Sequence, residues 1–245
     1  MESGPAVSIA GAIRVEGLEK SFDDWPVLWD LDLAVSWGEL VVLLGANGVG
    51  KTTLLRILAT QARADSGTVV IAGYNARRRP EAVRRRVGVV AHQTFLYDDL
   101  TCRENLVYYG RLYGLSDPRQ RASEALSRLG LAGREAQRVR TLSHGLQKRV
   151  AIARAILHQP PLLLLDEPET GLDPGSVSVL KDLLEEWTSA GRSVVMTTHN
   201  PELGMAWSDK VGVLCRGRVR FRGSDEYPDA AGFQELLSTT LGIGR

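Results

Sequence analysis

The stretch Gly45-Ala46-Asn47-Gly48-Val49-Gly50-Lys51-Thr52 decides how the rest of this sequence is interpreted. It matches the phosphate-binding pattern G-x-x-x-x-G-K-[ST] at every fixed position. An apolar run over 40–44 precedes it and a helical run over 53–59 follows, which is the strand–loop–helix order that such a loop requires. Glycines let the backbone wrap around an anion, and the N–H groups at a helix start hold phosphate oxygens. The stretch therefore predicts a nucleoside triphosphate site.

The last two residues of the stretch complete the predicted site. Lys51 supplies a positive charge for the β- and γ-phosphates, and Thr52 offers a hydroxyl to Mg²⁺. A glycine turn with an incidental lysine is the plain alternative. The strand and helix on either side of the loop favour the phosphate site.

Bulk composition is that of an ordinary soluble domain. The chain has 245 residues, of which 44% are hydrophobic and 24% charged, so we expect one large or two-lobed domain with a sizeable core. A net charge of +1 gives no overall field that favours nucleic acid. Cys102 and Cys215 form no metal or redox motif, which predicts a reducing compartment.

The ends of the chain and its apolar runs indicate whether it carries a signal peptide or crosses a membrane. Residues 1–12 are small and lack a basic segment, so a loose tail is expected there rather than a signal peptide. Residues 226–245 are expected to form a short helical tail. The longest apolar runs, such as 162–165, are far below the roughly 20 residues that cross a bilayer. We expect no membrane span, and any contact with a membrane to be made through a partner.

Strand and helix patterns alternate over much of the sequence, which predicts an α/β fold with a mostly parallel sheet. Strands are expected over 13–18, 27–35, 39–44, 68–71, 87–91, 162–166, 193–198, 211–215 and 218–222, and helices over 51–60 and 174–190. From 101 to 158 the pattern is helical almost throughout. We expect one domain over 13–225, with a core formed by 13–93 and 159–225 and an inserted helical subdomain over 94–158.

One dense basic run lies in the first half of the chain. It consists of Arg77-Arg78-Arg79-Pro80 followed by Arg84-Arg85-Arg86. Because the net charge is balanced, we interpret this run as a solvated helix face in preference to a nucleic-acid contact.

Two carboxylates follow an apolar strand of four leucines. At such a strand end, Asp166 is placed to hold the Mg²⁺ shell, and Glu167 points elsewhere and is a candidate general base for the attacking water. A helix cap is the alternative. It explains one acidic residue but not an acidic pair in a chain with a phosphate loop.

Four further features have no use in a generic phosphate-loop protein. Gln93 follows a strand where the helical region begins, and His199 ends the strand 193–198. A helix opens over 142–149, where Ser143 is a good N-cap and Gly145 leaves the backbone exposed. The turn Gly171-Leu172-Asp173 follows the acidic pair. Taken singly, each has a plain alternative as a surface polar residue, a cap, a turn or a satisfied histidine.

Taken together and in this order, the motifs resemble those of the ATP-binding cassette (ABC) ATPases, over residues 13 to about 222. The resemblance implies a P-loop NTPase fold with a RecA-like, mostly parallel core sheet, an antiparallel β subdomain and an inserted helical subdomain. It also implies ATP and Mg²⁺ as cofactors and ATP hydrolysis as the activity.

The resemblance assigns a role to each motif residue. Glu167 would be the catalytic base, His199 the switch that holds the γ-phosphate and the water, and Gln93 a contact to Mg²⁺ and water. Phe22 would stack on adenine, and Asp173 would lie at a dimer interface. Ser143 and Gly145 would bind the γ-phosphate held by a second subunit. The remaining ATP contacts would be Gly45, Asn47, Gly48, Gly50, Lys51, Thr52 and Thr53, and the metal contacts Thr52, Gln93 and Asp166.

This sequence departs from the usual family signature L-S-G-G-Q. His144 replaces the first glycine and Leu146 replaces the glutamine, whereas Ser143 and Gly145 remain. Because Ser143 and Gly145 remain, we still expect nucleotide to bind between two subunits, and the departures bear on the transporter subtype and the rate.

The resemblance implies partners as well. ATP would join two cassettes, as a homodimer or with a paired subunit, at the cytoplasmic face of the membrane, and an integral membrane permease would carry the cargo. The aromatic segments 94–97 and 106–109 would receive that subunit, with burial in the lobe core as the alternative. No nucleic-acid partner is expected.

The pair His92-Gln93, the altered signature and the ending 197–201 are most similar to the ATP-binding subunit of the haem exporter of cytochrome c biogenesis. ATPase subunits of ABC-2 type drug or lipid exporters are the alternative. Three other classes fit less well. An ABC ATPase of ribosomes or DNA would carry a second cassette, a coiled coil or a metal cluster. A small-molecule kinase leaves Ser143, Asp173 and His199 without a role, and a non-hydrolysing regulator leaves Glu167 without one.

Overall fold

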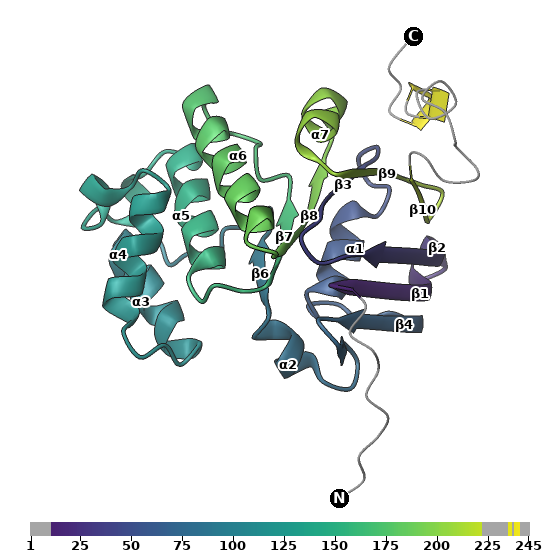
Figure 1. Ribbon diagram of the computed structural model, residues 1–245, viewed down its shortest axis with the longest axis horizontal. Coiled ribbons are helices and arrows are strands. Elements are labelled where there is room, and N and C mark those ends of the chain that lie inside the picture. Colours follow the sequence, from purple (N-terminus) through teal and green to yellow (C-terminus); the bar gives the residue numbers. More distant parts are fainter. Residues whose placement is uncertain (1–10, 222–234, 237, 241–245) are drawn as a thin grey trace, which may run out of the picture.

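A computed structural model describes residues 11–221, 235, 236 and 238–240 (Figure 1). Most of the predicted tails, 1–12 and 226–245, lies outside these described residues, as does residue 222 at the end of the last predicted strand. Within the described part of the chain, none of the helices combines the length and apolar character needed to cross a membrane.

The larger sheet is mostly parallel, as the sequence predicts. Its strands are β3 (Leu40–Leu44), β6 (Val87–Val90), β7 (Leu162–Asp166), β8 (Ser193–Thr198), β9 (Lys210–Cys215) and β10 (Arg218–Phe221). They lie in the order β10-β9-β3-β8-β7-β6, and every pair is parallel except β10 with β9. Strands β3, β7 and β8 are buried along their whole length, which explains their unbroken runs of leucine, valine and threonine.

The smaller sheet is antiparallel. It contains β1 (Ile13–Phe22), β2 (Trp25–Val35), β4 (Ser66–Ile71) and β5 (Tyr74–Asn75), in the order β2-β1-β4-β5. Strand β1 runs to residue 22, beyond the predicted end at 18, because register shifts after Val15 absorb Gly17, whose φ is 56°, and pairing then resumes. Strand β4 begins at Ser66, two residues before its predicted start at residue 68, and the two-residue β5 was not predicted.

Helices surround the larger sheet. They are α1 (Lys51–Leu58), α2 (Pro80–Arg84), α6 (Pro174–Ser189) and α7 (Pro201–Trp207). The segment between β6 and β7 forms α3 (Cys102–Leu112), α4 (Pro118–Arg128) and α5 (His144–Ile156), with short 3₁₀ turns over 132–134 and 139–141. In Figure 1, α3, α4 and α5 lie at the opposite end of the molecule from β1, β2 and β4.

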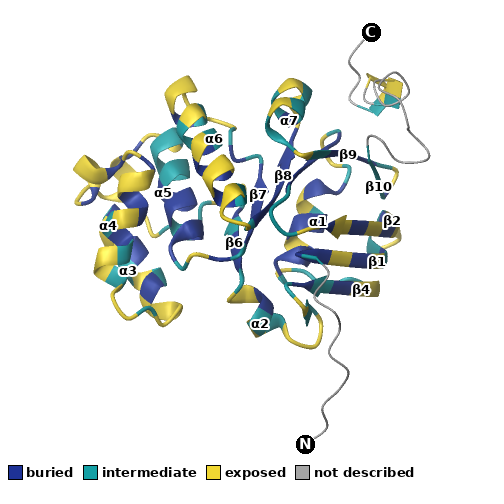
Figure 2. Cartoon of the chain, viewed as in Figure 1, coloured by how far each residue is buried: buried dark blue, intermediate teal, exposed yellow. Residues whose placement is uncertain are grey.

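Two hydrophobic cores lie on opposite faces of the larger sheet. Alternate residues of β3 enter different cores: Val42 and Leu44 pack with the helices α3–α6, whereas Val41 and Leu43 pack with α1 and the smaller sheet. This division follows from the period of two along a strand. Figure 2 shows buried residues continuing from the sheet into the inner sides of the helices. The sheet is therefore held from both faces, which fixes the loops at its strand ends.

Candidate functional site

The candidate site is built at the carboxyl ends of three adjacent parallel strands. In the sheet register, Leu44 of β3 is opposite Thr198 of β8, and Asp166 of β7 is opposite Thr197. The phosphate loop follows β3, Glu167 follows β7 and His199 follows β8. Because parallel strands end at one edge of a sheet, segments distant in sequence meet there.

The phosphate loop has the conformation that its glycines predict. Gly48 and Gly50 have φ values of 78° and 111°, which lie in the region that favours glycine. A Cβ atom on Gly50 would come within 2.9 Å of Val27 Cγ1. Helix α1 begins after Gly50 without a side-chain cap, so its first N–H groups are free to bind an anion. This cradle fits the phosphates of a nucleotide.

Lys51 is buried inside the loop that it serves. Its Nζ donates to the carbonyl oxygens of Gly45 at 2.7 Å and Ala46 at 3.2 Å, and lies 3.8 Å from Glu167 Oε1. Burial lowers the pKa of Lys51, while the charges of Glu167 and Asp166 act in the opposite direction. The ammonium group is thus fixed at the position where phosphate charge enters the loop.

Asp166 is a buried carboxylate with two hydroxyl partners. It accepts hydrogen bonds from Thr52 Oγ1 and from Thr197 Oγ1, each at 2.7 Å. A threonine hydroxyl and a carboxylate therefore lie side by side next to the phosphate loop. Oxygen ligands of this kind are those that Mg²⁺ takes in phosphate-loop sites. Asp166 and Thr52 fit the ion that the sequence predicts.

Glu167 has a strained backbone that turns it out of the strand. Its φ is 46°, and its N–H donates to the carbonyl oxygen of Thr197 at 3.1 Å. The carboxylate then lies between two basic groups, with Oε1 facing Lys51 and Oε2 at 3.5 Å from His199 Nδ1. A carboxylate held beside the phosphate loop by fixed neighbours is suited to accept a proton from water.

A cavity of about 550 Å³ joins these groups to the start of α5. It is lined by Asn47, Thr52, His92, Thr94, His144, Gln147, Lys148, Asp166, Glu167, Thr170 and Gly171. Gln93 is exposed and does not line the cavity, although both of its neighbours do, so its predicted role stays a prediction.

Two residues of the site were missed by sequence reasoning. Lys148 Nζ donates to the carbonyl oxygen of Glu167 at 3.1 Å, and burial lowers the pKa of this lysine. Thr197 donates to Asp166 and accepts from the N–H of Glu167. The one sequence signal that pointed to Thr197 as a site residue was its position two residues before His199, near the end of a predicted strand.

Ser143 and Asp173 both act as helix caps. Leu146 N–H approaches Ser143 Oγ at 3.4 Å, and Asp173 accepts from Ser176 N–H at 3.0 Å and Ser176 Oγ at 2.6 Å. The bonds from Ser176 lower the pKa of Asp173. Both residues are exposed, and neither lines the cavity of its own chain.

Gly145 packs against the turn that carries Asp173. A Cβ atom at Gly145 would lie 2.8 Å from the carbonyl oxygen of Gly171. The sequence predicted an exposed backbone at Gly145, but the residue is half-buried. Its missing side chain is what lets the start of α5 approach this turn.

The aromatic residue expected at the base of the nucleotide is exposed. Phe22 is 50% accessible, and the centroid of its ring lies 5.1 Å from Lys20 Nζ. A different aromatic, Trp29, lines a hollow of about 430 Å³ together with Gly48 and Val49 of the phosphate loop. Stacking of adenine on Phe22 therefore stays a prediction, and Trp29 is a second candidate that the sequence did not single out.

The aromatic segments 94–97 and 106–109 were expected either to receive a membrane subunit or to be buried in the lobe core. The structure has both buried and exposed side chains in them. Leu106 is fully buried in the core, whereas Tyr97 and Tyr108 are exposed, with their rings in edge contact at 5.2 Å. Phe95, Leu112 and Tyr113 are exposed nearby in sequence. These segments therefore supply both lobe core and an apolar surface.

The fold and the site together are those of an ATP-binding cassette, and comparison with known proteins agrees. Residues 28–170 match the family model described as ABC transporter. The chain belongs to the ABC transporter family, as an ATP-binding subunit with ATPase activity.

Curated relatives cover most of the chain. It is 36% identical to the ABC transporter ATP-binding protein NatA of Bacillus subtilis, over 80% of this chain and 81% of that protein. It is 38% identical to the doxorubicin resistance ATP-binding protein DrrA of Mycobacterium tuberculosis, over 94% of this chain and 72% of that protein. Neither relative is described as a haem exporter.

Solved structures share the fold. An ATP-binding subunit of an ABC transporter matches with a TM-score of 0.82 and 29% identity, over 92% of this chain and 94% of that one. A dimeric cassette in a post-hydrolysis state, bound to ADP and Pi, matches with a TM-score of 0.80 and 27% identity, over 86% of this chain and 97% of that one. The cbiO1 subunit of Clostridium perfringens, part of the transporter complex cbiONQ, matches with a TM-score of 0.77 and 28% identity, over 93% of this chain and 92% of that one.

Proposed function

We propose that this chain is the ATP-hydrolysing subunit of an ABC-2 type exporter of drug-like or lipid-like compounds. Identity of 38% over 94% of the chain to a doxorubicin resistance ATP-binding protein supports this assignment over haem export. The finer expectation of haem export from the sequence has no support in these relatives. The proposal places the chain at the cytoplasmic face of the membrane, bound to a separate permease.

Hydrolysis is carried by one arrangement, in which the Glu167 carboxylate lies between Lys51 and His199 beside the Asp166–Thr52 pair. The loop and Lys51 hold the phosphates, and Glu167 accepts the proton of the attacking water. His199 orients Glu167 through the contact at Nδ1. Thr52 and Asp166 are the residues that would hold Mg²⁺, which would supply neutralising charge to the phosphate oxygens.

A second copy completes the site in this proposal. Ser143 and Asp173 are exposed and do not line the cavity of their own chain, so their predicted contacts require another subunit. Ser143 caps α5 by accepting from the N–H of Leu146, and the first N–H groups of the helix, which have no acceptor within it, would bind the γ-phosphate held by the partner. Two such chains would enclose two ATP molecules between them.

The permease is proposed to contact the exposed aromatic surface formed by Phe95, Tyr97, Tyr108, Leu112 and Tyr113. All five are between 39% and 66% accessible, which is unusual for large apolar side chains on one lobe. Beside it lies a hollow of about 130 Å³ whose lining includes Tyr109, Tyr113 and Arg154. Aromatic side chains with a small hollow are typical of protein interfaces.

The experiment that tests the proposed hydrolysis is the substitution Glu167→Gln in the purified chain. It removes the proton acceptor and keeps the shape, so we expect Mg²⁺-dependent ATPase activity to fall about a hundredfold or more. ATP binding should persist and a dimer should accumulate with ATP, as measured by light scattering after size-exclusion chromatography. Glu202→Gln, which removes the same charge from an exposed position in α7, is the matched control and should keep the parent rate. Parent-like hydrolysis by Glu167→Gln would remove Glu167 from the role of base.

The cargo class is tested with the chain and its membrane subunit together in vesicles. Efflux of doxorubicin that requires ATP and is lost with Glu167→Gln supports the drug-exporter assignment. Transport of haem in the same vesicles, without transport of doxorubicin, would contradict it.

A further inference from the structure

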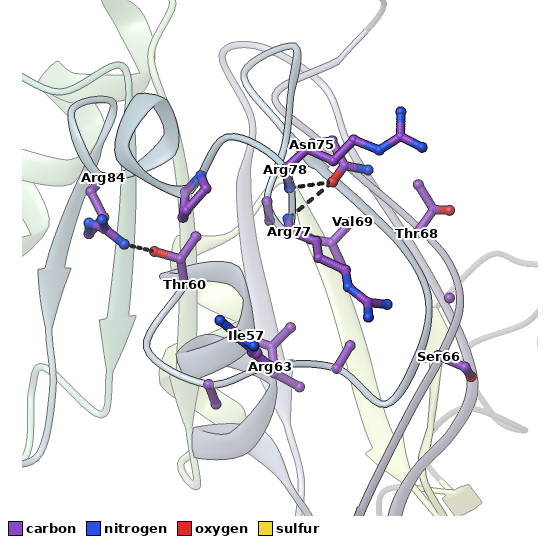
Figure 3. Close-up of a pocket in the computed structure, with 15 residues that line it drawn as sticks. Ile57, Thr60, Arg63, Ser66, Thr68, Val69, Asn75, Arg77, Arg78 and Arg84 are labelled. Carbon is purple, nitrogen blue, oxygen red and sulfur yellow. Dashed lines mark hydrogen bonds between the residues drawn. The ribbon is translucent and has the colours of Figure 1, made fainter.

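A separate basic cavity lies away from the ATP site. It has a volume of about 360 Å³ and shares no lining residue with the cavity at Asp166 and Glu167. The end of α1, the loop that follows it, the first part of β4 and the segment from β5 to α2 form its walls (Figure 3). Four arginines line it, namely Arg63, Arg77, Arg78 and Arg84, and none of the described residues in its lining is acidic.

The four guanidinium groups have no carboxylate partner among the described residues. None of them takes part in the ion pairs of that part of the chain. Two neighbouring acids are already bonded, since Ser66 donates to Glu19 at 2.8 Å and Lys20 donates to Asp65 at 2.7 Å, and a third, Glu81, lines the adjoining hollow and not this cavity. Four like charges around one hollow repel one another, and a bound anion would relieve that repulsion.

Hydrogen bonds to Asn75 and Thr60 hold three of the arginines in place. Asn75 Oδ1 accepts from the backbone N–H groups of Arg77 and Arg78 at 3.1 and 3.0 Å, so one side chain holds both residues at the rim. On the opposite side, Arg84 donates to Thr60 Oγ1 at 3.3 Å (Figure 3). The arginines thus reach the hollow from three segments on a fixed frame. Ile57, Val69 and Pro80 add an apolar part to its wall.

We propose that this cavity binds a phosphate-bearing anion of the phosphomonoester class. Guanidinium groups present forked donors that match phosphate oxygens in pairs, which a single lysine does not offer. The threonine hydroxyls of Thr60 and Thr68 supply further hydrogen-bond capacity, and the apolar wall suits the organic part of the ligand. The ligand is either a free phosphomonoester or the exposed phosphate of a lipid headgroup, which present the same chemistry.

The structure distributes the basic run of the sequence between two hollows. Arg77 and Arg84 line this cavity only, Arg78 lines both hollows, and Arg79 and Arg85 line only the neighbouring one, which also contains Glu81. The predicted exposure of the run to solvent is confirmed for all of its arginines except the half-buried Arg86, but the run is not a single helix face, since α2 spans only Pro80–Arg84. Arg79 and Arg85 are also exposed arginines of the same segment, so they provide a control with equal charge.

The test uses the full chain with its ATP site filled by Mg²⁺ and a non-hydrolysable ATP analogue, so that the phosphate loop does not compete. One arm titrates glycerol 3-phosphate by calorimetry. The other measures co-flotation with phosphatidylcholine vesicles that contain phosphatidic acid. In each arm the parent is compared with Arg77→Ala/Arg84→Ala and with the control Arg79→Ala/Arg85→Ala. The single variant Arg63→Gln, from a different segment, guards against a local folding defect in the first pair.

We expect Arg77→Ala/Arg84→Ala and Arg63→Gln to weaken binding, the pair by about tenfold or more, and the control pair to stay within about twofold of the parent. If the cavity variants bind glycerol 3-phosphate more weakly than the parent, the ligand is a free phosphomonoester. If they are weakened only in binding to the vesicles, the ligand is a lipid headgroup. Two outcomes overturn the proposal: no binding by the parent in either arm, or equal weakening by the cavity pair and the control pair. Neither depends on ATP hydrolysis, so failure here is separable from failure of the proposed function.

Discussion

At the scale of single residues, what the sequence reveals depends on whether a contact is local. The phosphate loop could be predicted because its spacing and its flanking elements lie in one continuous stretch. Thr197 could not, because its bond to Asp166 joins residues 31 apart in sequence and depends on the register of β7 with β8. Lys148 was missed for the same reason, since it meets Glu167 only after α5 packs beside the sheet. Roles carried over by resemblance, such as that of Gln93, depend on contacts with ligand and partner that one chain does not display.

Gly145→Ala tests the packing of the α5 start against the turn at Gly171. The added methyl group would meet the Gly171 carbonyl oxygen at 2.8 Å, so the helix start or the turn must shift. Both belong to the surface proposed to meet the second subunit. We expect ATPase activity to fall about tenfold or more, with nucleotide affinity of the single chain unchanged. Gly133→Ala, where a Cβ atom would meet nothing within 4 Å, should behave like the parent in both assays. Unchanged activity in Gly145→Ala would show that this contact has no part in the reaction.

At the scale of elements, sequence patterns located most strands and misplaced several boundaries. Apolar runs such as 162–166 matched β7 because a strand buried on both faces needs no other signal. The helical region 101–158 was predicted as one pattern, but the structure divides it at Gly114 and Gly130, whose φ values are 71° and 68°. A stacked pair then joins two of its helices. Tyr113, at the end of α3, lies on His158, just after α5, with ring centroids 3.7 Å apart.

The burial of His158 is expected to make stability depend on pH. Burial lowers the pKa of His158 to about 4, from an ordinary value of 6.5. The folded chain therefore keeps His158 neutral while the unfolded chain takes up a proton, so stability is complete above pH 6.5 and is lost as pH falls from 6.5 towards 4. We expect this residue alone to cost about 2 kcal/mol between pH 7 and pH 5. Denaturant unfolding measures the loss, and His158→Phe, which keeps a stacked ring, should remove that part of the pH dependence. A parallel pH profile in both proteins would contradict the assignment.

At the scale of the whole molecule, the sheet separates two cores and brings three distant segments to one edge. The arrangement that resemblance implied, with parallel and antiparallel sheets and inserted helices, is confirmed by the topology and by the solved cassettes that share it. The proposed dimer was not derivable from composition or periodicity, because in that proposal Ser143 and Asp173 complete a site only against another copy. The basic cavity was equally hidden, since Arg63 is separated in sequence from Arg77, Arg78 and Arg84.

Mixing two impaired variants tests the composite site. Lys51→Ala removes the phosphate loop's charge from one chain, and Gly145→Ala impairs the partner-facing surface of the other. A mixed dimer then pairs one intact loop with one intact α5 start, so the mixture should hydrolyse ATP faster than either variant alone at the same total concentration. Phosphate release is the measurement. A mixture with no more than the average of the two separate rates would show that each chain hydrolyses ATP on its own.

The position of β3 in the sheet has a consequence for how the protein is made. Its neighbours are β8 and β9, so Leu40 pairs with Val194, and Val41 pairs with Val195 on one side and Lys210 on the other. On a translating ribosome, β3 therefore emerges long before either neighbour exists, with a delay of roughly ten to thirty seconds at ordinary elongation rates. During that interval, the nascent chain carries an unpaired apolar strand and a phosphate loop without its acidic partners. ATP can help to complete the fold only after β7 and β8 have been synthesised.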